Sequence, residues 1–349
     1  MKILIVSAWH GDIYAQTFFN RFSLLGCDVY KFSWKEYFES KNRYIVPFLK
    51  FQNKYIIGPR VDKINTDLLD ECKKGAYDYV FIYGCTHIYS KTLEKIKKNL
   101  GVKIFGYNND DPFSEAYPKF FWRHFLNSIN YYDHIFSYRY SNIKKYKSMS
   151  FEKVSLLRSY YRKDYNFPVQ KNLCQDYIQD VVFIGHFEDD MRDEIFKFMI
   201  ENGVNLKIYG PEWKKSKYYN FFVNYQKCDI VPLQYKDYNL AINGAKIALV
   251  FLSKLNNDTY TRRCFEIPAT KTMMLSEFTN DLSSMFEEGV EAEYFRSKRE
   301  LVDKINFYLK NDKERIKIGN NGNDRLLRSE HEAMDRCKQV LKYMKPQIF

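Results

Sequence analysis

The chain has 349 residues, which is too long for one typical hydrophobic core and suits two domains. Apolar residues make up 45% of it and aromatic residues 18%, which excludes a wholly disordered chain. The net charge of +12 favours an anionic partner: nucleic acid, an anionic membrane surface or an anionic small substrate. Because the lysines are dispersed and no nucleic-acid-binding motif is present, nucleic acid is the weakest of the three.

Neither a disulfide framework nor a metal site is expected. The seven cysteines show no C-x-x-C spacing, and no pair of histidines accompanies them at metal-ligand distances. The apolar N-terminal run MKILIVSA is too short for a signal sequence, and no stretch is long enough to cross a membrane. The sequence therefore predicts a cytoplasmic protein, and its positive charge leaves peripheral association with the inner face of a membrane open.

The first half of the chain alternates between strands and helices, which indicates a parallel, doubly wound sheet. Strands are predicted at 2–7, 28–32, 79–83, 103–107, 134–137 and 154–157, and helices at 15–25, 66–74, 90–99, 115–129 and 141–147. Between them, YIVPFLKFQNKYIIGP (44–59) is an apolar excursion that we place near the acceptor or a membrane.

Residues 159–178 are polar, contain a proline and lose the periodicity, so they are predicted to link two domains. A second alternating series follows, with strands at 180–185, 205–209, 229–232, 247–251, 272–276 and 292–295, and helices at 190–202, 237–245, 264–270, 279–287, 298–310 and 330–344. The predicted fold is α/β, with two Rossmann-like domains facing a central cleft. The predicted domains are 1–160 and 175–330, with 331–349 packing back on the first.

Open α/β sheets bind ligands at the carboxyl ends of their strands. In the first half, His10 and Asp12 follow the first strand, and Asp110 and Asp111 follow the strand at 103–107. Each is a candidate base or contact for an acceptor hydroxyl. A hydrogen bond within the loop or a helix N-cap is the alternative for each.

In the second half, five residues lie next to predicted strands or begin the following helix. Gly185 ends a strand and Arg192 lies on the next helix, while Gly210 and Trp213 follow another strand. Trp213 is a candidate wall for a nucleobase, although a core tryptophan is commoner. Lys246 either meets a diphosphate or extends to solvent. The glycines form neither G-x-G-x-x-G nor a Walker A loop, so a nicotinamide-type fingerprint is absent.

The most informative stretch is 258–277, which contains a T-x-R-x-F-E cluster at a loop-to-helix boundary. The cluster holds Thr261, Arg263, Phe265 and Glu266. An arginine can bind phosphate oxygens through two hydrogen bonds, helix N-termini attract anions, and a glutamate accepts hydrogen bonds from ribose hydroxyls. The cluster therefore predicts a site for a phosphorylated sugar ligand. A surface salt bridge beside a packing helix is the alternative.

At this cluster the sequence resembles the CgeB-like spore-maturation glycosyltransferase family. The resemblance also includes AKIALVF, MLSE, FEEGVEAEYF and SKRELVDKINFYL within 236–310, and NNDDPF, VVFIG and IYGPEW in earlier parts of the chain. It implies a GT-B fold, in which a nucleotide-sugar binds mainly to the second domain and the acceptor to the first.

The resemblance also implies roles for particular residues. Retaining enzymes of this fold carry two glutamates separated by seven residues, and Asp258 and Glu266 have that separation. Glu266 would hold the nucleotide ribose, and Asp258 would lie near the donor sugar as a catalytic candidate. Arg263, with Arg192 or Lys246, would neutralise the departing diphosphate without a metal.

The function implied is that of a metal-independent glycosyltransferase without a cofactor. It would move a sugar from a nucleotide-diphosphate donor to a bacterial surface glycan, a glycolipid or a protein. The alternative is a catalytically silent nucleotide-sugar-binding or scaffold protein of a polysaccharide assembly system. Two departures from the family pattern favour that alternative: Asp258 replaces a glutamate, and Lys271 stands where the family usually has glycine.

Overall fold

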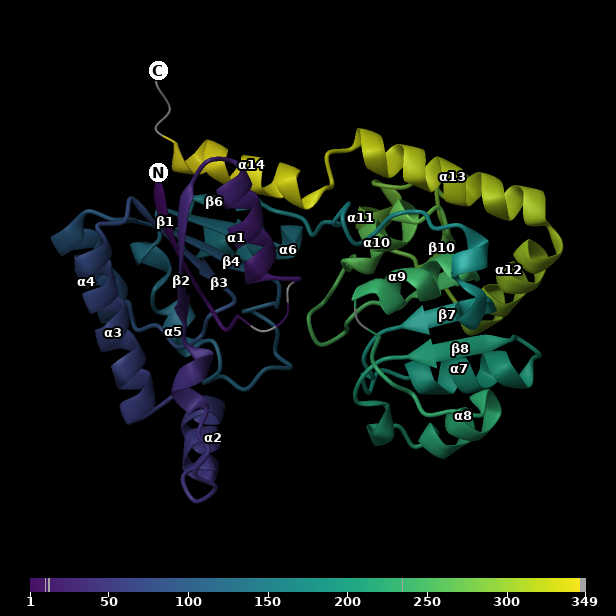
Figure 1. Ribbon diagram of the computed structural model, residues 1–349, viewed down its shortest axis with the longest axis horizontal. Coiled ribbons are helices and arrows are strands. Elements are labelled where there is room, and N and C mark those ends of the chain that lie inside the picture. Colours follow the sequence, from purple (N-terminus) through teal and green to yellow (C-terminus); the bar gives the residue numbers. More distant parts are fainter. Residues whose placement is uncertain (10, 12, 234, 346–349) are drawn as a thin grey trace. The chain divides into compact units, whose positions relative to one another are not determined.

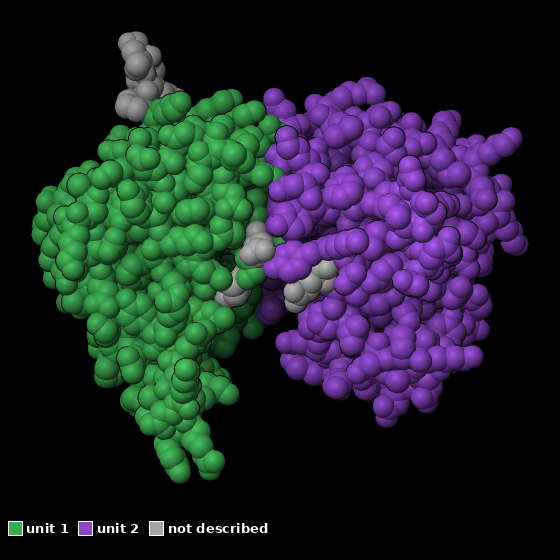
Figure 2. Space-filling view, in the orientation of Figure 1, with its two compact units in different colours: residues 1–158, 333–349 green, residues 159–332 purple. Residues whose placement is uncertain are grey.

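The computed structural model describes residues 1–9, 11, 13–233 and 235–345, and it divides into two compact units (Figures 1 and 2). Unit 1 contains residues 1–158 together with 333–349, and unit 2 contains residues 159–332. Each unit is built on one parallel sheet with helices around it. The predicted class, two Rossmann-like α/β domains, is confirmed.

The sheet of unit 1 has six strands in the order β2-β1-β3-β4-β5-β6, and all neighbours are parallel. All five side chains of β3, YVFIY, are buried, as expected for a parallel strand covered on both faces. The strands are β1 (Lys2–Ser7), β2 (Asp28–Ser33), β3 (Tyr79–Tyr83), β4 (Lys103–Asn108), β5 (His134–Ser137) and β6 (Val154–Leu156).

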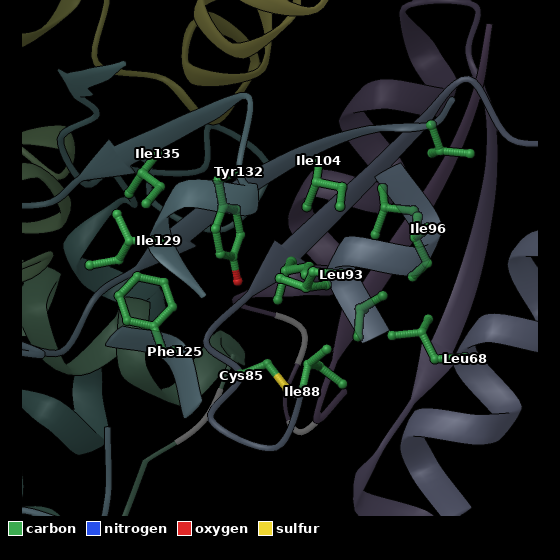
Figure 3. Close-up of a cluster of buried hydrophobic side chains, with 14 of the residues drawn as sticks. Leu68, Cys85, Ile88, Leu93, Ile96, Ile104, Phe125, Ile129, Tyr132 and Ile135 are labelled. Atoms are coloured by element: carbon green, nitrogen blue, oxygen red, sulfur yellow. The ribbon is translucent and has the colours of Figure 1, made fainter. Parts of the chain in front are cut away.

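Seven α-helices of the described chain belong to unit 1, and those that cover the sheet bury one apolar face each. They are α1 (Ala15–Leu24), α2 (Val46–Tyr55), α3 (Pro59–Gly75), α4 (Ser90–Leu100), α5 (Arg123–Leu126), α6 (Tyr140–Ser148) and α14 (Ala333–Met344). Figure 3 shows Leu68 of α3 and Leu93 of α4 in the core, with Tyr132 nearby. A β-carbon at Gly106 would lie 2.8 Å from the Tyr132 ring, so this glycine makes room for the tyrosine.

Helix α14 comes from the end of the chain but belongs to unit 1. The ring of Tyr343 lies 4.2 Å from that of His134 on β5. Gln339 Nε2 donates to the carbonyl of Leu156 at 2.7 Å, and Arg336 Nε donates to that of Arg158 at 2.9 Å. These contacts fix the last helix to the β5–β6 edge of the sheet.

The sheet of unit 2 has five parallel strands in the order β11-β10-β9-β7-β8. They are β7 (Gln179–Ile184), β8 (Leu206–Tyr209), β9 (Ala245–Val250), β10 (Met273–Glu277) and β11 (Glu293–Phe295). The helices are α7 (Arg192–Glu201), α8 (Tyr219–Gln226), α9 (Tyr235–Gly244), α10 (Arg263–Ala269), α11 (Asn280–Ser283), α12 (Lys298–Lys310) and α13 (Asp312–Arg328).

Two predicted elements are wrong, and a third, the helix predicted at 279–287, is shortened to α11 (Asn280–Ser283). The helix predicted at 115–129 is reduced to α5 and a short 3-10 turn, because Pro118 interrupts the segment. Residues 229–232 form no strand; they give one carbonyl, that of Val231, to the amide of Gly210, and Pro232 lacks the amide that a ladder needs. Among the described residues, no helix is both long and apolar enough to span a bilayer.

Candidate functional site

Arg263 lies at the carboxyl end of the unit 2 sheet. It begins α10, and a β-carbon built on Gly185, the residue after β7, would lie 3.4 Å from the guanidinium carbon. The same carbon lies 5.8 Å from the centre of the Phe183 ring. The missing side chain at Gly185 therefore leaves the space that the guanidinium uses. Ligands of open α/β sheets bind at this end of the strands.

The guanidinium of Arg263 is incompletely satisfied. Its Nε is buried, and within the described part of the chain no group accepts a hydrogen bond from it. Leaving a buried donor unpaired costs about 1–3 kcal/mol, and more for a charged group. An anion bound at this end of β7 would supply both the missing acceptor and the missing negative charge.

Glu266 lies one turn further along α10 and is buried. It accepts hydrogen bonds from Tyr238 Oη at 2.6 Å and from Arg262 Nε at 2.7 Å. Burial, and then the neighbouring Glu266, raise the pKa of Tyr238 well above its usual value, so the phenol keeps its proton and donates. A carboxylate has about four acceptor positions, so the described residues leave two for a ligand such as ribose.

A further arginine, Arg162, belongs to the same charged cluster. Burial and the neighbouring Arg262 lower the pKa of Arg162, while Glu266 opposes the change. The Arg162 guanidinium also lies 3.7 Å from the centre of the Tyr165 ring. Neither Arg162 nor Tyr238 was identified from the sequence: Arg162 lies in the segment interpreted as a linker, and that segment is part of unit 2.

Gly210 and Trp213 both pack against the backbone of Gly185. A β-carbon at Gly210 would lie 1.8 Å from the Gly185 carbonyl oxygen, to which Trp213 Nε1 donates at 2.9 Å. Trp213 is only 1% exposed, and its ring stacks on Phe196 at 5.6 Å. The interpretation of Trp213 as a wall for a nucleobase is therefore wrong, because the core occupies its ring.

Two cations that were predicted to bind a diphosphate instead form ion pairs within the protein. Arg192 is 1% exposed, binds both carboxylate oxygens of Asp190 at 2.8 and 2.7 Å, and donates to the His186 carbonyl at 2.9 Å. Lys246 pairs with Asp180 at 2.7 Å near the amino end of the sheet. Gly185 comes five positions after Asp180, which is about 17 Å along an extended strand. The prediction is wrong for both residues.

Asp258 and Thr261 lie in the loop between β9 and α10. The amide of Asp258 donates to the Ser253 carbonyl at 2.9 Å. Thr261 is buried, and its carbonyl accepts the amide of Cys264 at 3.1 Å, which starts the helix. Helix α10 has only seven residues and contains Pro268, so the Arg263 side chain rather than a helix dipole provides the positive charge.

Unit 1 contains a cavity of about 570 Å³ at the carboxyl ends of β1, β3 and β4. Aromatic rings form much of its wall: Trp9, Tyr14, Trp34, Tyr83, Phe120, Phe121 and Trp122. Four buried polar atoms on its lining residues have no hydrogen-bond partner within the described chain: Trp34 Nε1, Asn108 Nδ2, Asn109 Oδ1 and Trp122 Nε1. Apolar walls with a few unpaired donors and acceptors suit a hydroxyl-bearing ligand.

His87 also lines this cavity, although the sequence analysis did not single it out. Its ring stacks on Trp34 at 4.2 Å, and its Nε2 lies 2.9 Å from Asn53 Oδ1, which can only accept. Burial, and to a lesser extent His124, lower the pKa of His87 to about 3. The imidazole is therefore neutral with its proton on Nε2. The strand-end rule applied to Asp110 would have found it, because His87 follows β3.

The four acceptor-side candidates have different outcomes. Asp110 is exposed and lines the cavity, so its role stays a prediction. Asp111 is 2% exposed and its Oδ1 accepts the amide of Phe113 at 2.9 Å. It closes the turn after β4, so its catalytic role is wrong. His10 and Asp12 lie outside the described residues.

The comparisons with known proteins agree with this fold. Residues 192–342 match the model of the glycosyl transferase-like family. No curated protein matches the sequence. Among solved structures, sucrose-phosphate synthase from Thermosynechococcus elongatus is similar with a TM-score of 0.72 and 11% identity, over 98% of both chains. HepE from Anabaena, solved in complex with UDP-glucose, gives a TM-score of 0.69 and 10% identity, also over 98% of both.

TarM from S. aureus is similar over 79% of this chain and 58% of its own, with a TM-score of 0.56 and 11% identity. At such identities the likeness concerns the fold, which is the GT-B fold with its two Rossmann-like domains. The fold and the family match point to the same class of enzyme, the glycosyltransferases.

Proposed function

We propose that this protein transfers a sugar from a nucleotide-diphosphate donor bound by unit 2 to an acceptor bound by unit 1. One observation carries the donor half: the buried Arg263 Nε, unpartnered within the described chain, lies beside Gly185 at the carboxyl end of β7. A pyrophosphate is an anion with several acceptor oxygens, and arginine matches it better than any other side chain does.

The donor we favour is a UDP-sugar. HepE was solved with UDP-glucose, and TarM with UDP and alpha-GlcNAc-glycerol, and both share this fold. With the diphosphate at Arg263, the ribose hydroxyls would donate to the remaining acceptor positions of Glu266. Asp258, in the loop before α10, would lie on the sugar side.

The chemical step breaks the bond between the anomeric carbon and the diphosphate and forms one to an acceptor oxygen. The leaving diphosphate gains charge, and Arg263 would stabilise it; the acceptor proton passes to a base, for which Asp110 is a candidate. We propose that no divalent metal is needed. Arg263 would supply the positive charge that a metal ion otherwise gives to the leaving diphosphate. Transfer that persists in excess chelator is the expected result.

The acceptor we favour presents a sugar ring to the unit 1 cavity. Aromatic walls suit the C–H face of such a ring, and Trp122 Nε1 and Asn108 Nδ2 would donate to its hydroxyls. Among the described residues that line it, the cavity has one cation, Lys54, and one anion, Asp110, and this balance favours a neutral group over a strongly charged one. A bacterial surface glycan or glycolipid fits this chemistry, as does a protein that already carries a sugar.

We also propose that the protein is a CgeB-like glycosyltransferase that works in the cytoplasm on cell-surface polysaccharide, at the inner face of the membrane. The T-x-R-x-F-E cluster supports this, since Arg263 and Glu266 lie at the carboxyl end of the sheet or one turn from it. The Lys271 departure does not bear on the donor. Lys271 lies in the exposed turn before β10, at the other end of the strand, with φ +64°.

The second candidate is a catalytically silent nucleotide-sugar-binding protein. The observation in its favour is Asp258, whose side chain is one methylene shorter than the expected glutamate. Both candidates predict donor binding, and only the first predicts turnover.

A thermal-shift panel of UDP-, GDP-, CMP- and dTDP-sugars, followed by a nucleotide-release assay with glycan acceptors, separates them. We expect one donor class to stabilise the protein and to be consumed. Arg263→Gln should lower kcat/KM by about 100-fold or more, because the variant loses the positively charged hydrogen-bond donor that stabilises the leaving diphosphate. The matched control Lys246→Gln should keep full activity. Stabilisation without turnover would favour the silent protein, and no stabilisation by any donor would refute the site.

A further inference from the structure

Helix α2 and its flanks expose a group of large apolar side chains. Their exposed fractions are 81% for Tyr44, 37% for Ile45, 57% for Phe48, 49% for Phe51 and 43% for Ile57. We call these five residues the α2 surface. Tyr44, Phe48 and Phe51 follow the three-to-four-residue spacing of one helix face. In Figure 1, α2 projects from unit 1 beyond the helices next to it.

An adjacent face of the helix fixes α2 firmly to unit 1. Leu49 and Gln52 are each 2% exposed, and Ile56 is fully buried. Arg123 donates to the carbonyl of Tyr55 at 2.9 Å and also to that of Ile56, at the end of the helix. The α2 surface is therefore presented by an anchored helix, and its exposure does not arise from an unpacked loop.

Within the segment that carries the α2 surface, the charged residues have one sign. Between Glu39 and Asp62 the chain contains five cations, Lys41, Arg43, Lys50, Lys54 and Arg60, and no acidic residue. The first four are exposed. Arg43 and Lys54 also lie over neighbouring tyrosine rings at 5.4 Å. Exposed aromatic side chains surrounded by cations match the boundary between lipid headgroups and acyl chains of an anionic bilayer.

We propose that the α2 surface docks unit 1 onto an anionic membrane as a peripheral contact. With ten residues α2 is about 15 Å long, too short to span a bilayer, so it would lie in the interface. Asn53 and Lys54 of the same helix line the unit 1 cavity. If the proposed transfer holds, docking would bring that cavity close to the headgroups, where a lipid-linked acceptor presents its sugar.

Vesicle co-sedimentation tests the docking without any transfer assay. We expect the protein to bind vesicles that contain phosphatidylglycerol and to stay in solution with phosphatidylcholine alone. Each lysine or arginine near an anionic surface contributes about fivefold to binding. The triple variant K41Q/R43Q/K50Q should therefore bind about 100-fold more weakly. Its control, K91Q/K95Q/K144Q, removes three lysines of unit 1 that are also exposed and should bind within a few-fold of wild type.

The double variant F48S/F51S tests the contribution of the apolar side chains to membrane binding. Its control is L24S/Y140S, which changes two residues elsewhere on unit 1 that are 69% and 54% exposed. The first pair should lose most binding and the second should keep it. Equal losses in variant and control, or no binding of the wild type to anionic vesicles, would overturn the proposal. So would a stable dimer in analytical ultracentrifugation that F48S/F51S dissociates, because a second copy would then cover the α2 surface. A failed transfer assay would leave these outcomes unchanged.

Discussion

At the scale of single residues, the partner of a side chain decides its role, and the sequence does not show the partner. Arg192 and Arg263 both lie at the start of a helix of unit 2. The Asp190 carboxylate binds Arg192 through two hydrogen bonds, which leaves little of its charge for a ligand. Arg263 has a buried, unsatisfied Nε beside Gly185. Arg263 therefore stays the predicted diphosphate contact, whereas the prediction for Arg192 was wrong.

Burial of His87 gives unit 1 a pH-dependent stability. The pKa of His87 is about 3 in the folded protein, against about 6.5 when unfolded, so the unfolded state binds the proton first as the pH falls. The contribution of His87 to the free energy of unfolding is fully present above pH ~6.5. Below that pH the free energy of unfolding falls by up to about 1.4 kcal/mol per pH unit. His134, with a folded pKa of about 4, adds to the effect.

The expected result is that His87→Asn lowers stability at neutral pH but makes it fall less steeply toward pH ~5. Urea unfolding at a series of pH values measures both quantities. An unchanged slope in the variant would show that His87 does not carry the dependence.

At the scale of elements, hydrophobic periodicity predicted most of the strands and the main helices, because buried parallel strands read as continuous apolar runs. This periodicity was not sufficient where packing in the folded protein outweighs the local helix propensity. Helix α13 was not predicted as a separate element, since Gly319 and Gly322 weaken a helix. Both are needed: a β-carbon at Gly319 would lie 2.3 Å from the Lys271 carbonyl oxygen, and one at Gly322 would lie 2.4 Å from that of Glu291.

The contact between α13 and the turn before β10 gives a pair of opposite predictions. Gly319→Ala should destabilise unit 2 by about 1–3 kcal/mol, because a methyl group must displace backbone. Lys271→Gly should stabilise it by about 0.5–1 kcal/mol, because Lys271 has φ +64°, which favours glycine.

Denaturant unfolding of both variants measures the two changes, with Lys271→Ala as the control that keeps the backbone strain. Neither donor binding nor transfer should respond to Lys271→Gly. A change of donor preference in that variant would contradict the assignment of Lys271 to a turn.

At the scale of the whole molecule, the sequence predicted two α/β domains from strand–helix alternation, but it did not predict the order of the strands. Nothing local distinguishes β2-β1-β3 from another order, since the crossovers depend on which helix packs on which face. The same limit applies to the sites. Asn108, Trp34 and Trp122 reach one cavity from distant parts of the chain, and no spacing in the sequence links them.

If unit 2 alone holds the nucleotide, hydrogen exchange should show it. UDP should slow amide exchange mainly in residues 184–187 and 261–266, around Gly185 and Arg263, while the unit 1 segment 134–157 exchanges as before. Mass spectrometry of peptides from the intact protein, with and without UDP, measures this. Protection confined to unit 1 would contradict the proposed nucleotide site in unit 2.

The central claim is that Arg263 binds the diphosphate, and calorimetric titration of UDP and of uridine into wild type and Arg263→Gln tests it most directly. Losing a charge-assisted contact to phosphate costs about 1.5–3 kcal/mol, which is about 10- to 150-fold in affinity. The loss is expected for UDP alone, with uridine bound equally by both proteins and Lys246→Gln behaving as wild type. Equal affinities of wild type and Arg263→Gln for UDP, or the same loss for uridine, would contradict it.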